Sequence, residues 1–172
     1  VAPLFRDPAR FLGQIAERLH ERRLADTGPF INAVHHKPET LGLSIPISRH
    51  SVDGYLMPDT YRFPKQLSER QIIKEMLRNW NVKVLRPYSA NFRASDLPMD
   101  KIVVLASLIE REAKVPQDRP LISSVIRNRL KRNMKLEIDA TVIYALGKHK
   151  EKLSFADLKV KIFADGADYE GI

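Results

Sequence analysis

Apolar residues recur at helical spacing along most of this chain. Near the N-terminus, Asp7 and Pro8 are suited to the start of a helix, with an N-cap followed by proline at the first helical position. The apolar face that follows runs to about residue 23 and consists of Phe11, Leu12, Ile15, Ala16 and Leu19. Residues 27–36 are expected to form a second short helix.

The middle of the chain alternates between extended and helical patterns. Residues 54–63 look extended and rich in turns, with aromatic side chains at Tyr55, Tyr61 and Phe63. Ser68 and Gln71 have the spacing of a capping box, which predicts a helix starting there. Its apolar face is Ile73, Met76, Leu77 and Trp80. Residues 87–99 are read as a polar connector.

The most informative stretch runs from Met99 to Gly147, and its first segment, 101–114, is an apolar-rich helix candidate. The apolar stripe of this helix is Val104, Leu105, Leu108 and Ile109. Because a helix turns about 100° per residue, Glu112 falls within this stripe and Glu110 lies on the far side. A carboxylic acid shielded by Leu108 or Ile109 would favour its protonated form near neutral pH, as a general acid requires. The simpler alternative is a solvated glutamate in the last helical turn.

Two further helices are expected after this one. Asp118 can cap a helix with apolar positions at Leu121, Ile122, Val125, Ile126 and Leu130, which should pack beside the Glu112 helix. Asp139 can cap a shorter helix that ends at Gly147. The fold expected from these patterns is α+β with helices dominant, and the Glu112 helix should form one side of a cleft.

Composition is that of a globular protein, with 44% hydrophobic and 29% charged residues among 172. Because the chain has no cysteine, disulfides and thiol chemistry are excluded. No apolar run approaches the roughly 20 residues that cross a membrane, and no signal-peptide pattern opens the chain. The adjacent His35 and His36 have no ligand partners at metal-binding spacing, so a metal site is not expected.

The net charge of +8 favours a polyanionic partner, either a nucleic acid or an anionic cell-wall polymer. The densest basic cluster is Arg127, Arg129, Lys131, Arg132 and Lys135. No aromatic residues interleave with this cluster to stack on bases, which argues against nucleic acid. A solvated helix face is the alternative for such a cluster.

Several ordered blocks resemble the endolytic murein transglycosylases, also called YceG-like proteins. The blocks read GYLMPDTYRF at 54–63, ASLIEREA at 106–113, VIRNRL at 125–130, MKL at 134–136 and DATVIY at 139–144, followed by LS at 153–154. Their order and spacing are similar to the family pattern from about Gly54 to Asp157. The resemblance assigns the catalytic glutamate to the second of the Glu-x-Glu pair, which is Glu112.

The resemblance implies a lysozyme-like catalytic cleft around a central helix and a lyase reaction that requires no metal or cofactor. A single glutamate would serve as acid and then base, cleaving the bond between N-acetylmuramic acid and N-acetylglucosamine. Further residues in the matching blocks become candidate substrate contacts: Tyr61, Glu110, Asn128, Asp139, Thr141 and Tyr144. Asn128 can equally be an internal hydrogen-bonder, Asp139 a helix cap, and Tyr61 part of a structural strap.

The same resemblance suggests how a parent protein is organised. Residues 1–52 would be the end of a small LysM-like module, and residues 53–172 a catalytic domain truncated at its C-terminus. The parent would have a single N-terminal anchor in the bacterial inner membrane and an extracytoplasmic catalytic part, with glycan strands and cell-wall synthesis proteins as partners. Since the chain starts at Val1, we expect a processed or excised piece.

Residues 159–172 depart from the family pattern, which usually continues into a proline-rich loop. If that loop lines the groove, this chain would be less active than a longer parent. The competing hypothesis from another class is a basic helical adaptor that binds nucleic acid or a protein without catalysis. Steep salt dependence and no product from glycan strands would distinguish the adaptor.

Overall fold

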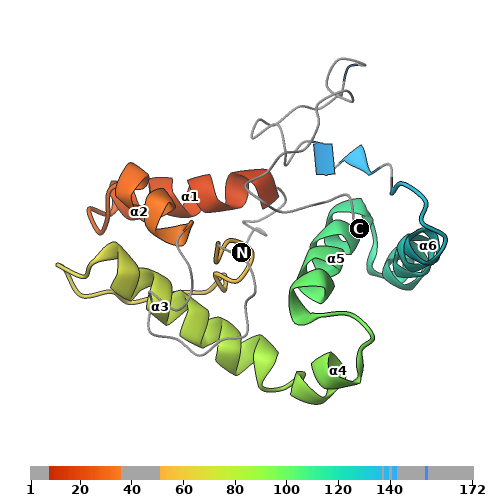
Figure 1. The fold of residues 1–172 in the computed structure, drawn as a ribbon. Coiled ribbons are helices and arrows are strands. Elements are labelled where there is room, and N and C mark those ends of the chain that lie inside the picture. The colour runs from red at the N-terminus through yellow and green to blue at the C-terminus, as the bar shows by residue number, and fades with distance from the viewer. Residues whose placement is uncertain (1–7, 36–50, 137, 140, 143–153, 155–172) are drawn as a thin grey trace. The chain divides into compact units, whose positions relative to one another are not determined.

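The computed structural model describes residues 8–35, 51–136, 138–139, 141–142 and 154. The chain divides into two compact units. We call Phe11–Val103 the N-terminal unit, and Val104–Ile172 together with Val1–Arg10 the C-terminal unit. Each unit is described by itself (Figure 1).

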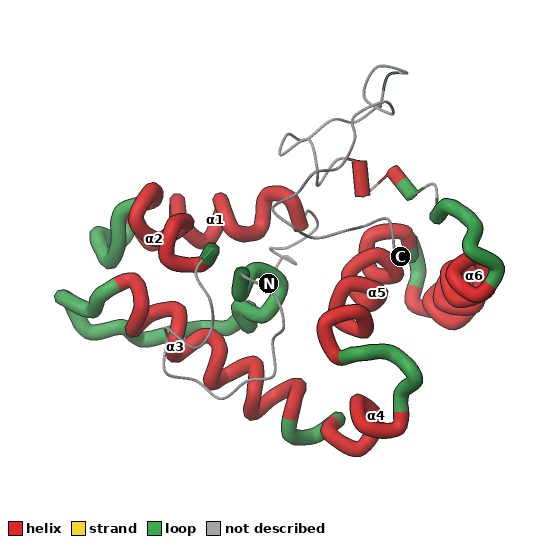
Figure 2. Tube along the Cα trace, viewed as in Figure 1, coloured by secondary structure: helices red, strands yellow, loops and turns green. Residues whose placement is uncertain are grey.

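Six α-helices with defined bounds occur in the described residues, and no strand occurs among them (Figure 2). Asp139, Thr141 and Val142 are helical as well, in the region where a shorter helix was predicted. The helices are α1 (Pro8–Glu21), α2 (Thr27–Val34), α3 (Glu69–Trp80), α4 (Ser89–Ala94), α5 (Met99–Glu112) and α6 (Arg119–Lys131). A π-helical segment, η2 (Asn81–Leu85), continues α3, and a short 3-10 helix, η3 (Pro116–Asp118), precedes α6. The helix-dominated architecture is therefore confirmed, whereas the β part of the expected α+β fold has no counterpart in the described residues.

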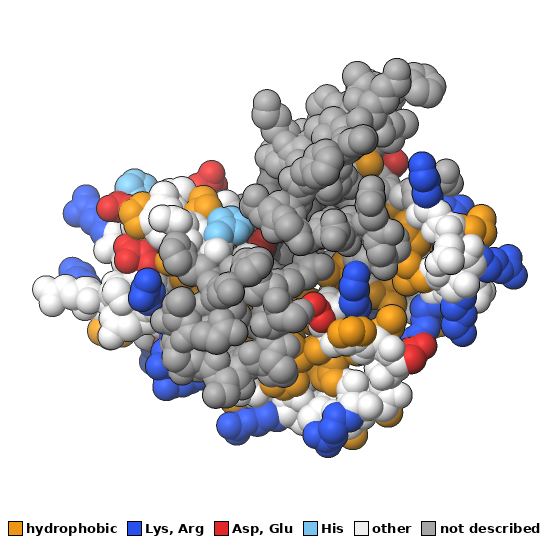
Figure 3. All heavy atoms as spheres, viewed as in Figure 1, with side chains coloured by type: hydrophobic (Ala, Val, Ile, Leu, Met, Phe, Trp, Pro, Cys, Tyr) orange, Lys and Arg blue, Asp and Glu red, His pale blue; other side chains and the backbone are white. Residues whose placement is uncertain are grey.

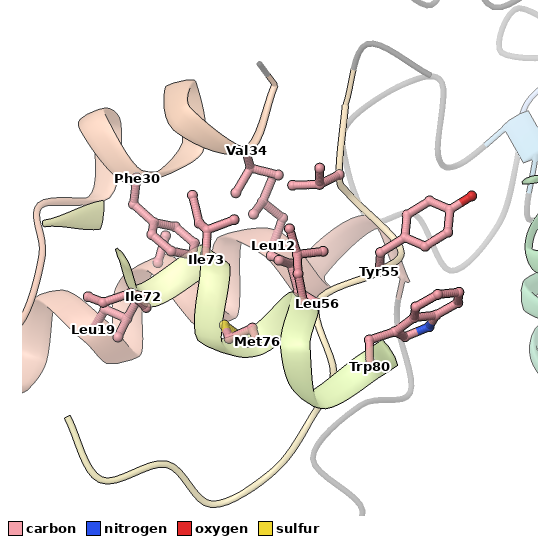
Figure 4. Packing of buried hydrophobic residues seen from close by; sticks show 13 residues of the cluster. Leu12, Leu19, Phe30, Val34, Tyr55, Leu56, Ile72, Ile73, Met76 and Trp80 are labelled. Carbon is pink, nitrogen blue, oxygen red and sulfur yellow. The ribbon is translucent and has the colours of Figure 1, made fainter. Parts of the chain in front are cut away.

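The core of the N-terminal unit is built by α1, α2, α3 and the segment 52–56 between α2 and α3 (Figure 4). The fully buried side chains include Phe30 and Val34 of α2 and Ile72, Ile73 and Leu77 of α3. Tyr55 and Trp80 meet edge to face, with ring centroids 5.0 Å apart and an interplanar angle of 73°. Burying so many large apolar groups supplies the main driving force for this unit to fold.

The predicted apolar face of α1 is largely correct. Leu12, Ala16 and Leu19 are buried, while Ile15 is half-buried at the edge of the core. Arg23 then adopts a positive φ of 55°, and Leu24 N–H donates to Leu19 O at 2.9 Å. A left-handed residue just past the helix, followed by this reversed bond, is how many helices end.

The capping box at the start of α3 is confirmed. The Ser68 hydroxyl accepts a hydrogen bond from Gln71 N–H at 3.4 Å, and Gln71 Oε1 accepts one from Ser68 N–H at 2.9 Å. At the other end, Arg86 N–H donates to Asn81 O at 2.9 Å, a bond of the π type. The helical hydrophobic pattern predicted α3 but gave no sign of this π segment.

The predicted polar connector at 87–99 is wrong in part, because α4 lies inside it. This helix has only six residues and no buried side chain. A helix this short and without a buried side chain leaves no apolar periodicity in the sequence, so the hydrophobic pattern could not predict it.

In the C-terminal unit, the predicted stripe of α5 is the face that the structure buries. Leu105 and Leu108 are buried and Val104 and Ile109 are half-buried. In α6, however, only Ile126 is fully buried, and Leu121 and Val125 are 67% and 47% exposed. Of the apolar positions expected in this helix, Leu121 and Val125 therefore lie largely outside the core.

The predicted module boundary at residues 52/53 lies within the N-terminal unit. There Val52 N–H donates to Val34 O at 3.0 Å, and Val52 is completely buried. Residues on both sides of the boundary thus belong to one core, and the division of a parent protein into modules at this position stays a prediction.

Candidate functional site

Glu112 is the last residue of α5, and its side chain is exposed. The side chain is therefore not buried, and the expectation that Leu108 or Ile109 at least partly shields it stays a prediction. Glu112 lies on the helix face that carries Leu105 and Leu108, but α5 ends at this residue. The residues that follow in the chain, Lys114 to Gln117, are exposed as well. No hydrogen bond or ion pair joins Glu112 to another residue of the described ranges, so its carboxylate is not committed to a partner there.

Glu110 has a different environment from Glu112. Its Oε2 accepts hydrogen bonds from the Arg119 guanidinium at 2.8 Å (Nη2) and 3.1 Å (Nε). Arg119 is the first residue of α6, so the pair links α5 to the start of the next helix. Since the side chains are 67% and 46% exposed, the pair contributes at most about 1 kcal/mol. The main consequence of the pair is geometric, because it holds the Glu110 carboxylate against Arg119 on the side of α5 that faces away from the apolar stripe.

The remaining candidates in the C-terminal unit are distributed along α6 and the segment after it. Asn128 is exposed on α6 and forms no side-chain hydrogen bond with the described residues, which removes the internal hydrogen-bonder as its explanation there. Asp139 is also exposed. Thr141 Oγ1 donates to Ile138 O at 2.6 Å, so its hydroxyl hydrogen is used locally. Tyr144 lies outside the described residues.

Tyr61 lies in the N-terminal unit, where a polar network holds its hydroxyl group. The hydroxyl donates to Met57 O at 2.7 Å and accepts from Asn79 Nδ2 at 3.1 Å. Desolvation is the main reason why the pKa of Tyr61 is raised. The phenol is therefore a neutral, internally bonded group, and its ring is the part available to other molecules.

The network continues to a carboxylate that the sequence analysis did not single out. Asp59 Oδ2 accepts from Asn79 Nδ2 and from Lys83 Nζ, each at 2.6 Å, and Oδ1 accepts from Thr60 N–H at 2.8 Å. The hydrogen bond with Lys83, supported by those from Asn79 and Thr60, lowers the pKa of Asp59 from 3.8 to about 2. The four-residue spacing of Asn79 and Lys83 predicts that both lie on one helix face, but it does not indicate Asp59 as their partner.

The aromatic residues of this strap, defined as residues 57–63, form one side of a surface groove. Tyr61 and Phe63 stack with parallel rings, 5.2 Å between centroids and 5° between planes. The groove has a volume of about 500 Å³ and lies between residues 61–64 and a face of α3 that extends from Gln71 to Arg78. Its opposite side carries Leu67, Gln71, Lys74, Glu75 and Arg78.

Part of the predicted basic cluster of α6 stabilises the fold through hydrogen bonds. Arg129 Nη1 donates to the carbonyl oxygens of Lys135 and Leu136 at 3.1 and 2.7 Å, which fixes the chain that leaves the helix. Lys131, Arg132 and Lys135 are exposed. On the visible face of each unit, Lys and Arg side chains are spread over α3, α4 and α6 rather than gathered in one patch (Figure 3).

Neither a metal site nor a membrane-spanning helix occurs in the described residues. They contain no group of three or more His, Asp or Glu side chains placed to hold a metal ion. His35 instead lies with Nδ1 at 3.2 Å from Ser51 Oγ. None of the described helices is both long enough and apolar enough to cross a membrane.

The chain belongs to the YceG-like family, whose model matches residues 8–166. The matched range includes all six described helices, the strap and both glutamates of α5. This confirms the resemblance read from the sequence blocks.

Among curated proteins, the chain is 41% identical over 113 residues to an endolytic murein transglycosylase of Bacillus subtilis. It is 34% identical over 132 residues to one of Streptococcus pneumoniae strain D39. These matches cover 65% and 74% of this chain, but only 31% and 24% of the relatives. The chain therefore spans about a third of their length or less.

A solved structure shares the fold. A YceG-like protein of Listeria monocytogenes superposes with a TM-score of 0.74 at 33% sequence identity. The match covers 88% of this chain and 53% of that one.

Proposed function

We propose that this chain is part of an endolytic peptidoglycan transglycosylase and carries its catalytic glutamate, Glu112. The observation that carries the proposal is family membership over residues 8–166, together with relatives named as endolytic murein transglycosylases. The block that contains Glu112 lies inside the matched range. The substrate would be the glycan strands of peptidoglycan, and the products strands with 1,6-anhydro-N-acetylmuramic acid ends.

In the proposed reaction Glu112 acts twice. As an acid it gives its proton to the glycosidic oxygen, so that the bond from C1 of N-acetylmuramic acid breaks and N-acetylglucosamine leaves. As a base it takes the proton of the C6 hydroxyl of the same muramic acid while that oxygen bonds to C1. The proton that Glu112 gives up is replaced by the one it takes from the C6 hydroxyl, and no water is consumed. The reaction is therefore an intramolecular substitution at C1, a transglycosylation, rather than a hydrolysis.

The environments of the two glutamates support this choice of acid. Most glycosidases use two carboxylates on either side of the bond, whereas residues two apart on a helix point in different directions. Glu110 is paired with Arg119, while the Glu112 carboxylate at the helix end is not committed to a partner in the described ranges. We therefore assign proton transfer to Glu112 and a positioning role to Glu110, which links α5 to α6.

Other parts of the proposal extend beyond this one residue. A cleft along α5 would hold the glycan, with Asn128, Asp139, Thr141 and Tyr144 as contacts in the C-terminal unit. Tyr61 would contact glycan through its ring. A parent protein would be anchored in the bacterial inner membrane, act outside it and associate with cell-wall synthesis proteins.

The test compares wild type, Glu112→Gln and Glu110→Gln on purified peptidoglycan strands, with anhydro-muropeptides measured by mass spectrometry. Loss of a positioned general acid should lower the rate roughly 10²- to 10⁴-fold in Glu112→Gln. Glu110→Gln keeps its shape and one hydrogen-bond acceptor for Arg119, so it should retain most of the activity. Circular dichroism of both variants checks that the fold survives. Equal losses in two folded variants would refute the assignment.

The adaptor hypothesis makes the opposite prediction for the same experiment. A basic helical adaptor would form no anhydro product at any enzyme concentration and would bind nucleic acid with a steep dependence on salt. Hydrolysed ends without anhydro rings would also contradict the proposal, because they require water at C1.

A further inference from the structure

The groove between the strap and α3 combines two kinds of surface, aromatic and positively charged. One side has the parallel rings of Tyr61 and Phe63, both half-exposed. The other side has positively charged side chains from α3. A ligand that fills the groove therefore meets an apolar flat face and a charged rim together.

The charges of the rim do not cancel. Arg78 pairs with Glu75 one helical turn earlier. Arg62 and Lys74 also line the groove, and neither forms an ion pair with any residue of the described ranges. Within the described ranges, Arg62 and Lys74 are therefore unpaired cations that could bind an anionic group. Glu75 is the only carboxylate among the residues that line the groove.

The ring of Tyr61 is held in place before any ligand arrives. Its hydroxyl is bonded to Met57 O and Asn79, and Asn79 is in turn bonded to Asp59. The side chain cannot swing to another χ1 rotamer without breaking two hydrogen bonds, so less entropy is lost when a ligand packs on the ring. Because the hydroxyl is occupied, the aromatic face rather than the oxygen is what the groove offers.

We propose that this groove binds a carboxylate-bearing N-acetylated sugar, with the ring of Phe63 or Tyr61 against the sugar face and Lys74 or Arg62 against the carboxylate. The glycan itself comes from the proposed function, on which this inference rests. Muramic acid units with their peptides have both features, since each has a hexose face and nearby carboxylates. Uncharged chitin-type oligosaccharides have only the first.

The groove is a binding site and not a second catalytic centre. Its one carboxylate, Glu75, is paired with Arg78, and Glu112 belongs to the C-terminal unit. The groove would therefore contribute affinity for the strand while leaving the chemistry to Glu112.

The experiment measures binding by titration calorimetry in the full chain carrying Glu112→Gln, so that the ligand is not turned over. The probes are a tetrasaccharide muropeptide with its stem peptides, chitotetraose, and a short oligothymidylate. Two groove changes are added to this background. Phe63→Leu keeps the apolar bulk and removes the ring, and Lys74→Glu reverses one unpaired charge.

Phe63→Leu should weaken binding of both saccharides up to roughly tenfold, the scale of one aromatic contact. Lys74→Glu should weaken muropeptide binding about fivefold and leave chitotetraose unchanged. Arg22→Glu is the matched control, because Arg22 is exposed beyond the end of α1 and does not line the groove. It alters net charge by the same amount and should change muropeptide affinity less than about twofold. Thermal unfolding followed by Trp80 fluorescence confirms that each variant is folded.

Three results would overturn the inference: unchanged muropeptide affinity in both groove variants, equal losses in Arg22→Glu and Lys74→Glu, or tighter binding of the oligothymidylate that the same groove variants abolish. Failure of the proposed function is recognised separately. In that case the wild type forms no anhydro product, while Phe63→Leu and Lys74→Glu still weaken muropeptide binding. In the converse case the wild type forms anhydro product, while both groove variants bind the muropeptide as tightly as the wild type does. That result would refute the groove proposal alone.

Discussion

Removing the Tyr61 hydroxyl tests whether this residue serves the structure through its oxygen and ligands through its ring. In Tyr61→Phe the ring stays, but Met57 O loses its donor at 2.7 Å and Asn79 loses its acceptor at 3.1 Å. A net hydrogen bond contributes about 0.5–1.5 kcal/mol, and both partners are half-buried, so water replaces only part of the loss. We expect the free energy of unfolding to fall by about 1–2 kcal/mol.

The size of the Asn79 contribution can be isolated with a double-mutant cycle. Asn79→Ala removes the bonds to both Tyr61 and Asp59, so it should cost more than Tyr61→Phe alone, about 1–3 kcal/mol. Each single variant loses the hydrogen bond between Tyr61 and Asn79, whereas the double variant loses this bond only once. The coupling energy between the two positions should therefore be about 0.5–1.5 kcal/mol.

Urea unfolding followed by Trp80 fluorescence is a suitable assay, because Trp80 is buried in the same core. Tyr88→Phe is the matched control, since Tyr88 is 56% exposed and its hydroxyl bonds to no described residue. It should change stability by less than about 0.5 kcal/mol. A Tyr61→Phe variant as stable as wild type, or a coupling energy near zero, would refute the network as a stabilising unit. Groove binding by Tyr61→Phe should remain, because the ring is unaltered.

Three further predictions concern single positions of the N-terminal unit. The depressed pKa of Asp59, about 2 against an ordinary 3.8, means that its stabilisation is complete above the ordinary value and is lost as the pH falls through about 2. Thermal melts between about pH 5 and pH 2 should show this acid loss in wild type and a weaker one in Asp59→Asn. Ser68→Ala removes the hydroxyl of the capping box and should lower stability by about 1 kcal/mol in the same urea assay. Gly54→Ala should cost about 1 kcal/mol although open space surrounds the position, because φ is +86° there; a neutral result would show that the turn relaxes.

Local sequence rules were sufficient where one helix face or one turn decides the structure. The buried positions of α1, α3 and α5 follow from apolar spacing, and the capping box follows from Ser68 and Gln71 alone. Both signals depend on residues no more than a few turns apart. The helical wheel and the family blocks both point to Glu112 rather than Glu110, and this choice stays a proposal.

Features that depend on residues distant in sequence could not be read from the pattern. Asp59 meets Asn79 and Lys83 across 20 and 24 residues, and no periodicity joins an extended strap to a helix end. The groove could not be predicted for the same reason, because it forms only where the strap lies against α3. Glu112 shows a different limit: the helical wheel gives the direction of a side chain but not whether any element covers that direction.

The exposure of Glu112 gives the proposed chemistry a specific requirement. A carboxylic acid that must hold a proton, release it and take another one needs water kept away from the reacting sugar. Within the described residues Leu105 and Leu108 are buried earlier along the same helix, but nothing encloses the Glu112 side chain. In our proposal the bound glycan itself must therefore complete the enclosure, so that the acid becomes effective only with substrate in place. Such an arrangement fits an enzyme whose C6 hydroxyl nucleophile arrives with the substrate, since the attacking group and the group that excludes water are then parts of the same strand.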